Sequence, residues 1–89
     1  MSNREKVIRA LCEVFNLKRE QVERDVFTGK TDPGQWSPRA EVVIHTEGAI
    51  PSDGGYSVSI TEKWFAVTEK LDGLFCEPVN GAVVAVHKS

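Results

Sequence analysis

Long apolar runs, cysteine and an excess of charge of one sign are all scarce in this chain of 89 residues. No apolar stretch approaches the roughly 18 residues that a membrane-spanning helix requires. Residues 1–5 are not followed by the apolar segment of a secretory signal. The net charge of −2 disfavours a protein whose main task is to neutralise phosphates or coat an anionic membrane. We therefore expect a cytoplasmic protein that does not bind membranes.

The 2 cysteines, Cys12 and Cys76, are too few for a disulfide framework. We expect each to be a small buried apolar side chain in a reducing compartment, and a Cys12–Cys76 disulfide is the alternative. Apolar residues make up 40% of the chain and charged residues 27%, as in an ordinary globular protein. The length fits a single domain that spans residues 1–89.

An amphipathic helix is predicted near the start of the chain. Ser2 and Glu5 have the spacing of a capping box, in which each side chain bonds the backbone amide of the other residue. Asn16 readily takes the left-handed conformation that ends a helix, and residues 18–25 favour a further helical turn. Between these signals one face is apolar, formed by Val7, Ile8, Leu11, Val14 and Phe15.

A second helix, predicted over residues 61–75, organises the rest of the chain. Thr61 is a suitable N-cap residue, and Gly73 either ends the helix or is tolerated inside it at a cost of about 1 kcal/mol. The apolar stripe of this helix requires a sheet to pack against. It consists of Trp64, Val67, Leu71, Leu74 and Phe75.

Alternation of apolar and polar residues predicts strands at 40–46, 56–60 and 82–87. Glycine and proline make residues 28–38 a loop. The order helix, strand, strand, helix, strand indicates the α+β class: a two-layer α/β sandwich with a three-stranded, mostly antiparallel sheet and both helices on one face. The last strand either runs parallel to the second strand or lies beside the first, where all neighbours are antiparallel.

So few elements leave the second face of the sheet uncovered. Because side chains alternate along a strand, that face would carry small and mildly apolar residues rather than long charged ones. Trp36 within the loop either folds back onto the core or is an exposed anchor. Phe65, which lies beyond the helix stripe, either packs under the N-terminal helix or is an anchor for another protein. The predicted partner-binding residues are Trp36, Val43, His45, Phe65, Val83, Ala85 and His87.

These features favour a small acidic protein-binding module. It would act through the open sheet face, a strand edge or the Trp36 loop, as a regulator or inhibitor of a larger protein or by self-association as a homodimer. Its size would also suit a protein of phage or mobile-element origin.

The alternative is a nucleic-acid-binding domain. Five basic residues could form a stripe beside Trp36, although acidic residues interleave with them. The order of elements resembles that of type II KH domains, but the Gly-x-x-Gly loop that clamps the nucleic-acid backbone in those domains is missing here. The basic residues are Lys18, Arg19, Arg24, Lys30 and Arg39.

No motif indicates catalysis, a cofactor or a metal. His45, His87 and Cys76 could be imagined around a zinc ion, but their spacing matches no zinc signature. No serine or cysteine is placed beside a base by the sequence, and Gly54-Gly55 precedes a predicted strand rather than a helix that could bind phosphate. We expect neither an enzyme, nor a metal site, nor a bound cofactor.

Overall fold

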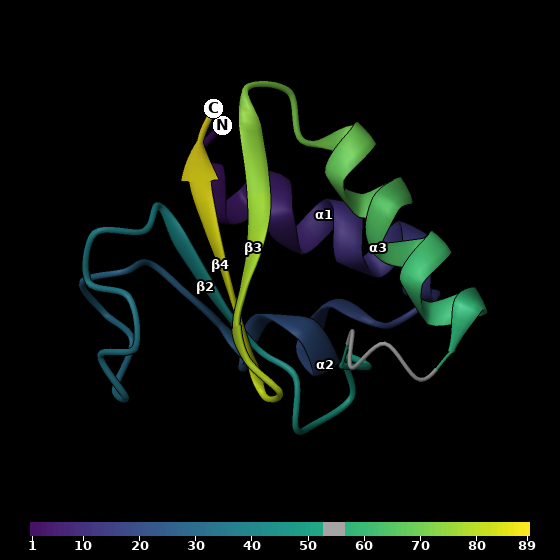
Figure 1. The fold of residues 1–89 in the computed structure, drawn as a ribbon, viewed down its shortest axis with the longest axis horizontal. Coiled ribbons are helices and arrows are strands. Elements are labelled where there is room, and N and C mark those ends of the chain that lie inside the picture. The colour runs from purple at the N-terminus through teal and green to yellow at the C-terminus, as the bar shows by residue number, and fades with distance from the viewer. Residues whose placement is uncertain (53–56) are drawn as a thin grey trace.

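The protein folds as a small α+β structure with a 4-stranded antiparallel sheet in the order β1-β2-β4-β3 (Figure 1). The computed structural model describes residues 1–52 and 57–89. Helices lie on one side of the sheet, and a long loop lies on the other. The elements are α1 (Asn3–Phe15), α2 (Arg19–Glu23), β1 (Val26–Phe27), β2 (Val42–His45), α3 (Val58–Lys70), β3 (Leu74–Asn80) and β4 (Val83–Lys88).

Helix α1 begins and ends where the sequence predicts. The Ser2 hydroxyl accepts a hydrogen bond from the Glu5 amide at 3.1 Å, which satisfies one of the free N–H groups of the first turn. Asn16 closes the helix in the left-handed conformation with φ 54°. The second bond of the expected capping box would run from the Ser2 amide to the Glu5 carboxylate. That carboxylate binds Arg19 instead.

The expectation of a three-stranded sheet is wrong, because residues 74–80 form an additional strand and β1 adds a short one. The second predicted helix ends at Lys70 rather than at Phe75. Gly73 has φ 77°, a conformation that glycine adopts without steric cost, and it turns the chain away from the helix axis. Leu74 and Phe75, which fit the helix pattern, therefore begin β3.

The predicted strand over residues 56–60 is also wrong. Val58 to Ile60 form the first turn of α3, and Tyr56 lies outside the described residues. Ser57 explains the difference: its hydroxyl accepts a hydrogen bond from the Ile60 amide at 3.3 Å and so caps the helix. The cap at Ser57 agrees with the apolar stripe of α3, which extends back through Ile60. Together these two helix signals outweigh the short alternating pattern of residues 56–60.

The alternation along β2 and β4 correctly predicts which side chains face the helices. Val42, Ile44, Val84 and Val86 join the core beneath α1 and α3. The two strands are antiparallel neighbours, with Val42 opposite Val86, so the alternative in which the last strand lies beside the first predicted strand is confirmed. A second, smaller cluster on the opposite face contains Ala40, Val43, Val83 and Ala85.

The turn at Gly73 provides a test of the observed boundary between α3 and β3. Gly73→Ala places a side chain at a positive φ and should lower the free energy of unfolding by about 1–2 kcal/mol, measured by urea titration. Gly81→Ala is the matched control, since that glycine has open space around it and no positive φ, and it should change stability by less than about 0.5 kcal/mol. Equal effects of the two substitutions would contradict the assigned turn.

Candidate functional site

The second face of the sheet is covered by the chain itself. Val43, Val83 and Ala85 are only 0%, 2% and 0% exposed, so the expectation that they lie on an open surface is wrong. Residues 28–41 lie across the sheet from the helices (Figure 1), and Ala40 from this segment packs into the same cluster. The prediction assumed that only helices could cover a sheet, whereas here a loop does so.

An aspartate within the loop fixes it to the sheet. The buried Asp32 carboxylate accepts hydrogen bonds from the Gly34 amide at 3.2 Å and the Trp36 amide at 3.1 Å, which hold the turn. His45 on β2 brings its Nε2 to 2.7 Å from Asp32 Oδ1, and its ring lies edge-on to Phe27. We refer to these two residues as the Asp32–His45 pair, which gives His45 a structural partner within the chain.

The surroundings of Asp32 favour its charged form. Burial alone raises the pKa of this carboxyl, but the hydrogen bonds from His45 and from the Trp36 and Gly34 amides outweigh burial. The result is a pKa below the ordinary value of 3.8. The charged carboxylate is therefore the form that holds the loop.

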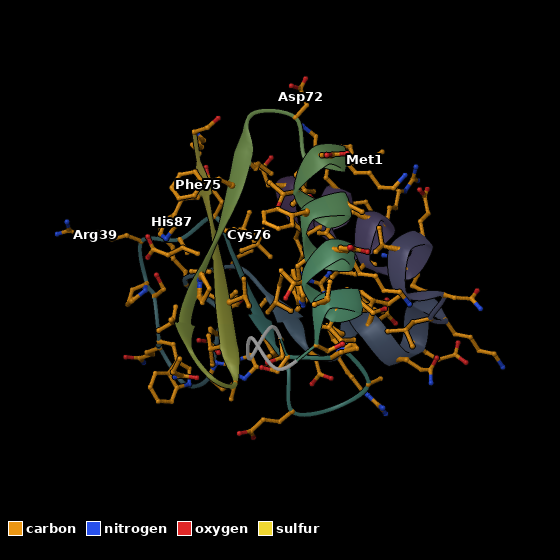
Figure 2. The ribbon with its side chains drawn as sticks, turned by 45° about the vertical axis from the view of Figure 1, so that its right-hand side comes forward. Met1, Arg39, Asp72, Phe75, Cys76 and His87 are labelled. Atoms are coloured by element: carbon orange, nitrogen blue, oxygen red, sulfur yellow. The ribbon has the colours of Figure 1, made fainter. Side chains whose placement is uncertain are left out.

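His87 lies on the same sheet face as the loop but nearer β3. Its ring is tilted against Phe75 with the ring centroids 5.5 Å apart, and Figure 2 shows the two side chains next to each other. The His87 Nε2 is 3.9 Å from Glu77 Oε1, which is a loose ion pair at most. Phe75 is 39% exposed, so this pair forms a small apolar patch at the end of the sheet.

Trp36 is 53% exposed, so the alternative in which it folds back onto the core is wrong. Its backbone is fixed by Asp32, while its indole lies against Gly34, where an added Cβ would come within 2.6 Å of the ring nitrogen. The side chain thus stands on a rigid turn at the surface of the loop and belongs to neither apolar cluster.

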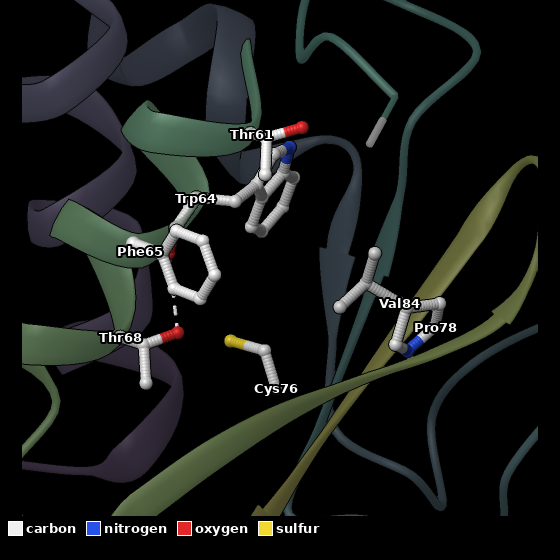
Figure 3. A pocket seen from close by; sticks show the side chains of 7 residues that line it. All are labelled: Thr61, Trp64, Phe65, Thr68, Cys76, Pro78 and Val84. Carbon is white, nitrogen blue, oxygen red and sulfur yellow. Dashed lines mark hydrogen bonds between the residues drawn. The ribbon is translucent and has the colours of Figure 1, made fainter. Parts of the chain in front are cut away.

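A hollow lies between α3 and β3, which we call the α3–β3 groove (Figure 3). Its cavity measures about 100 Å³, and Phe65 stands at its rim with 66% of its surface exposed. In Figure 3 the Phe65 ring and the Cys76 thiol approach the same space from opposite sides. The lining residues are Thr61, Trp64, Phe65, Thr68, Cys76, Pro78 and Val84.

The thiol in this groove is not activated. Burial raises the pKa of Cys76, and the neighbouring Thr68 side chain offsets this only in part. A nucleophilic cysteine requires the thiolate, which a neighbouring cation or base would favour, and none of the described residues that line the groove is either. Cys76 therefore contributes a polarisable apolar surface to the groove.

Strand β3 is an edge of the sheet, and its residues Cys76 and Pro78 line the groove. The Ser89 amide donates to the Gly73 carbonyl at 3.0 Å, and bonded positions alternate along an antiparallel ladder. The backbone groups of Cys76 and Pro78 therefore face away from β4. Since proline has no N–H, Cys76 supplies the one amide donor at this part of the edge.

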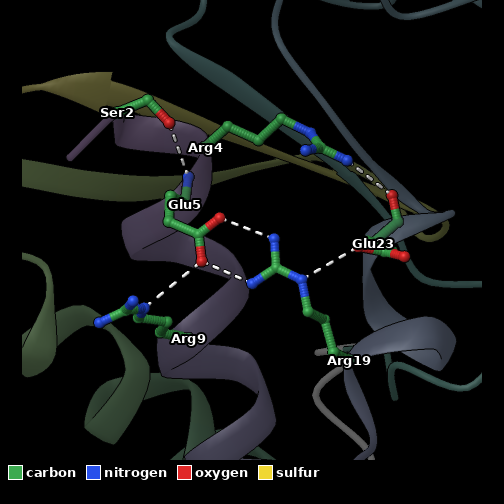
Figure 4. Close-up of polar contacts among 6 residues, drawn as sticks. All are labelled: Ser2, Arg4, Glu5, Arg9, Arg19 and Glu23. Atoms are coloured by element: carbon green, nitrogen blue, oxygen red, sulfur yellow. Dashed lines mark hydrogen bonds and ion pairs between the residues drawn. The ribbon is translucent and has the colours of Figure 1, made fainter.

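The five basic residues of the predicted stripe do not form one surface. Arg19 donates to Glu5 Oε1 at 2.7 Å and to Glu23 Oε2 at 3.1 Å (Figure 4). The hydrogen bond from Arg19, together with that from Arg9, lowers the pKa of Glu5 to about 2. Lys18 and Arg24 flank α2, whereas Lys30 and Arg39 belong to the loop across the sheet. Arg19 is thus already paired with two carboxylates of the chain.

The described residues contain no group of three or more His, Cys, Asp or Glu side chains that could hold a metal ion. Cys76 and His87 point to opposite faces of the sheet, and His45 is bonded to Asp32. Within residues 1–52 and 57–89 no helix has the length and apolar character needed to cross a membrane. Comparisons with protein-family models, curated proteins and solved structures gave no match.

Sequence reasoning identified Phe65 but missed the other side of its groove. Cys76 and Pro78 lie on β3, a strand that the sequence analysis did not predict because Leu74 and Phe75 also fit the apolar stripe of the preceding helix. The Asp32–His45 pair was missed as well. The turn residues Asp32-Pro33-Gly34 indicated that the Asp32 side chain would bond nearby amides, but its distant histidine could be found only from the fold.

The Asp32–His45 pair makes stability depend on pH. The pKa of Asp32 is lower in the folded than in the unfolded chain, so its contribution is complete above the ordinary value of 3.8 and is lost as the pH falls through the folded-state value. Glu5, with a folded pKa of about 2, acts in the same direction. The free energy of unfolding, measured by urea titration, should therefore fall steadily between about pH 5 and pH 2.

Asp32→Asn isolates the aspartate from the other carboxyls. At pH 7 it should lower the free energy of unfolding by about 2 kcal/mol, because an amide nitrogen replaces an acceptor that faces N–H donors. The difference from the unchanged protein should shrink as the pH falls below about 4. Asp72→Asn, at an exposed site, is the control and should have almost no effect. An Asp32→Asn protein of full stability at pH 7 would show that the pair does not hold the loop.

Proposed function

We propose that this protein is a small protein-binding module, a regulator or inhibitor of a larger protein, and that its partner inserts an extended segment at the α3–β3 groove. The observation that carries the proposal is the position of Phe65. A phenylalanine that is 66% exposed stands at the rim of a cavity whose floor is already apolar. Covering such a ring can contribute about 1.5–3 kcal/mol to binding, which favours a partner that packs against it.

The size of the cavity favours a protein partner over a metabolite. Pockets for small molecules typically measure about 300–1,000 Å³. The groove holds about 100 Å³, which suits one apolar side chain. The remainder of a partner would then lie outside the cavity, against Phe65 and along β3.

The free edge of β3 favours an extended segment. An extended peptide can pair with an exposed strand, and the backbone groups of Cys76 are directed outward for such a bond. Pro78 and the irregular register between Pro78 and Asn80 limit this pairing to a short stretch. The affinity would therefore come chiefly from side chains, and the backbone contact would set the direction of the segment.

The other predicted binding surfaces receive less support from the geometry. Val43, Val83 and Ala85 lie beneath the loop, so a partner could reach them only if the loop moved. Trp36 remains an exposed alternative anchor. Nucleic-acid binding is weakened as a proposal because Arg19 is paired with acids and the other cations are divided between two regions.

Selection from a displayed library of random linear peptides tests the proposal. Peptides selected on the purified protein should lose at least about tenfold in affinity for Phe65→Ala, measured by fluorescence polarisation, because truncating a central aromatic anchor typically costs more than about 1.4 kcal/mol. Phe65 belongs to neither apolar cluster, so the substitution should leave the thermal unfolding midpoint nearly unchanged.

Trp36→Ala is the matched control, since it also removes an exposed aromatic ring from outside both clusters. It should change the affinity by less than about twofold. If the selected peptides depend on Trp36 and not on Phe65, the loop is the binding surface and the groove assignment is wrong. If no peptide is enriched over repeated selections, the proposal of peptide binding fails.

A further inference from the structure

The two faces of β3 differ in what they offer to a segment that lies along its edge. Cys76 lines the groove on the face that carries the helices. Phe75 and Glu77 lie on the other face, where both approach His87. Figure 2 shows Phe75 and His87 on one side of β3 and Cys76 on the other. Three successive positions of this strand therefore present an apolar ring, the groove and a carboxylate.

The register of β3 determines which of these residues can bond a further strand. Phe75 lies opposite His87 and Glu77 opposite Ala85, and the backbone groups of Phe75 and Glu77 bond β4. The N–H and C=O of Cys76 face outward. Among the described residues of this edge, Cys76 alone offers both groups, since Pro78 has no N–H and the Leu74 amide donates to the Leu71 carbonyl at 3.2 Å.

This arrangement favours an antiparallel segment. In an antiparallel pair, one residue of the segment exchanges both bonds with Cys76, and its side chain lies on the same face as the Cys76 thiol. A parallel segment would divide the two bonds between two of its residues, with slanted and weaker geometry. We call the residue opposite Cys76 the anchor residue, because its side chain is directed into the cavity beside Phe65.

The neighbours of the anchor residue fall on the other face of the sheet. In an antiparallel segment, the residue before the anchor lies opposite Glu77 and the residue after it lies opposite Phe75. Both are non-hydrogen-bonded pairs, in which the side chains come closest together. Phe75 is 39% exposed and favours an apolar neighbour. The Glu77 side chain is 61% exposed and disfavours an acidic one, since like charges directly opposite each other are destabilising.

We infer that the partner of the α3–β3 groove is an extended segment that runs antiparallel to β3 and carries two consecutive apolar residues. The first apolar residue is the anchor, which enters the cavity beside Phe65. The second packs on Phe75 across the sheet edge, and the residue before the anchor is not acidic. This inference rests on the proposed function and specifies the direction and side-chain pattern of the partner at that same site.

The same edge of a second copy lacks this pattern. Two copies that exchange both backbone bonds would pair about Cys76 itself, because a two-fold interface places the same residue on both sides. Phe75 of each copy would then lie opposite Glu77 of the other copy, which sets an apolar ring against a carboxylate twice. A segment of a different protein is therefore the occupant that the register favours.

N-methylation of the tightest peptide selected on the purified protein tests the backbone pairing. The anchor is the apolar peptide residue whose alanine substitution has no further effect on the Phe65→Ala protein. Methylation of its amide removes the donor to the Cys76 carbonyl and should weaken binding about fivefold, measured by fluorescence polarisation. Methylation of the next amide, which points away from β3, should weaken binding by less than about twofold.

A charge exchange tests the direction of the segment. A peptide with glutamate placed before the anchor should bind Glu77→Lys about fivefold more tightly than the unchanged protein at low salt, with a smaller gain at high salt. Glutamate placed after the anchor lies opposite Phe75 and should gain less than about twofold. Glu47→Lys changes the net charge equally at an exposed site elsewhere and should leave both affinities within about twofold.

Phe75→Ser tests the contact on the second face. It should weaken the selected peptide about threefold, because the residue after the anchor loses its apolar neighbour. Val79→Ser is the matched control, since Val79 is 37% exposed on the same strand but lies beyond Pro78, where the register becomes irregular. It should change the affinity by less than about 1.5-fold.

The outcomes separate the two levels of the argument. If the peptides require Phe65 but tolerate methylation of the anchor amide, the segment does not pair with β3, so the inference is wrong and the proposed function stands. If Glu77→Lys favours glutamate after the anchor rather than before it, the segment is parallel, which also overturns the inference. If the free protein sediments as a dimer that Phe65→Ala dissociates, a second copy occupies the edge and the inference fails. If no peptide is selected, the proposed function and the inference fail together.

Discussion

The buried contact between Asp32 and His45 determines which surfaces of this protein are open. A 4-stranded sheet with helices on one side exposes its other face to water unless another part of the chain covers it. Here the loop of residues 28–41 covers that face, and one charged side chain joins the loop to the sheet with Nε2 and Oδ1 2.7 Å apart. Because burial of an unpaired carboxylate is costly, the loop and the histidine depend on each other.

With the second face covered, the side of the molecule between α3 and β3 is one of the places where apolar surface meets solvent. Gly73 makes this arrangement possible, since its positive φ turns the chain after α3 has ended at Lys70, so that the chain returns as an edge strand. The strand brings Cys76 and Pro78 opposite Phe65 and so creates the groove. Pro78 also limits strand pairing along this edge, because it has no N–H to donate.

Part of this structure could be predicted from the sequence, where the signals are local. Short patterns predict the helix cap at Ser2, the helix end at Asn16 and the sheet face on which Val42 and Val84 lie. Phe65 was identified because it lies outside the apolar stripe of its helix. The boundaries of α3 could not be predicted, because local signals for a helix and for another structure compete there. Ser57 could cap a helix or alternate in a strand, and Leu74 and Phe75 fit the helix period although they lie beyond the glycine that ends it.

The covering of the second sheet face was harder to predict, because no local pattern indicates that a loop will pack across a sheet. The open-face prediction for Val43 and Ala85 failed for this reason.

The solvent accessibility of methyl groups, measured by NMR line broadening with a soluble nitroxide, tests the account most directly. We predict little broadening for the methyls of Val43, Val83 and Ala85 and strong broadening for those of the exposed Val58 and Val79. Equally strong broadening at Val43 and Ala85 would contradict the closed face on which the assignment of the groove depends.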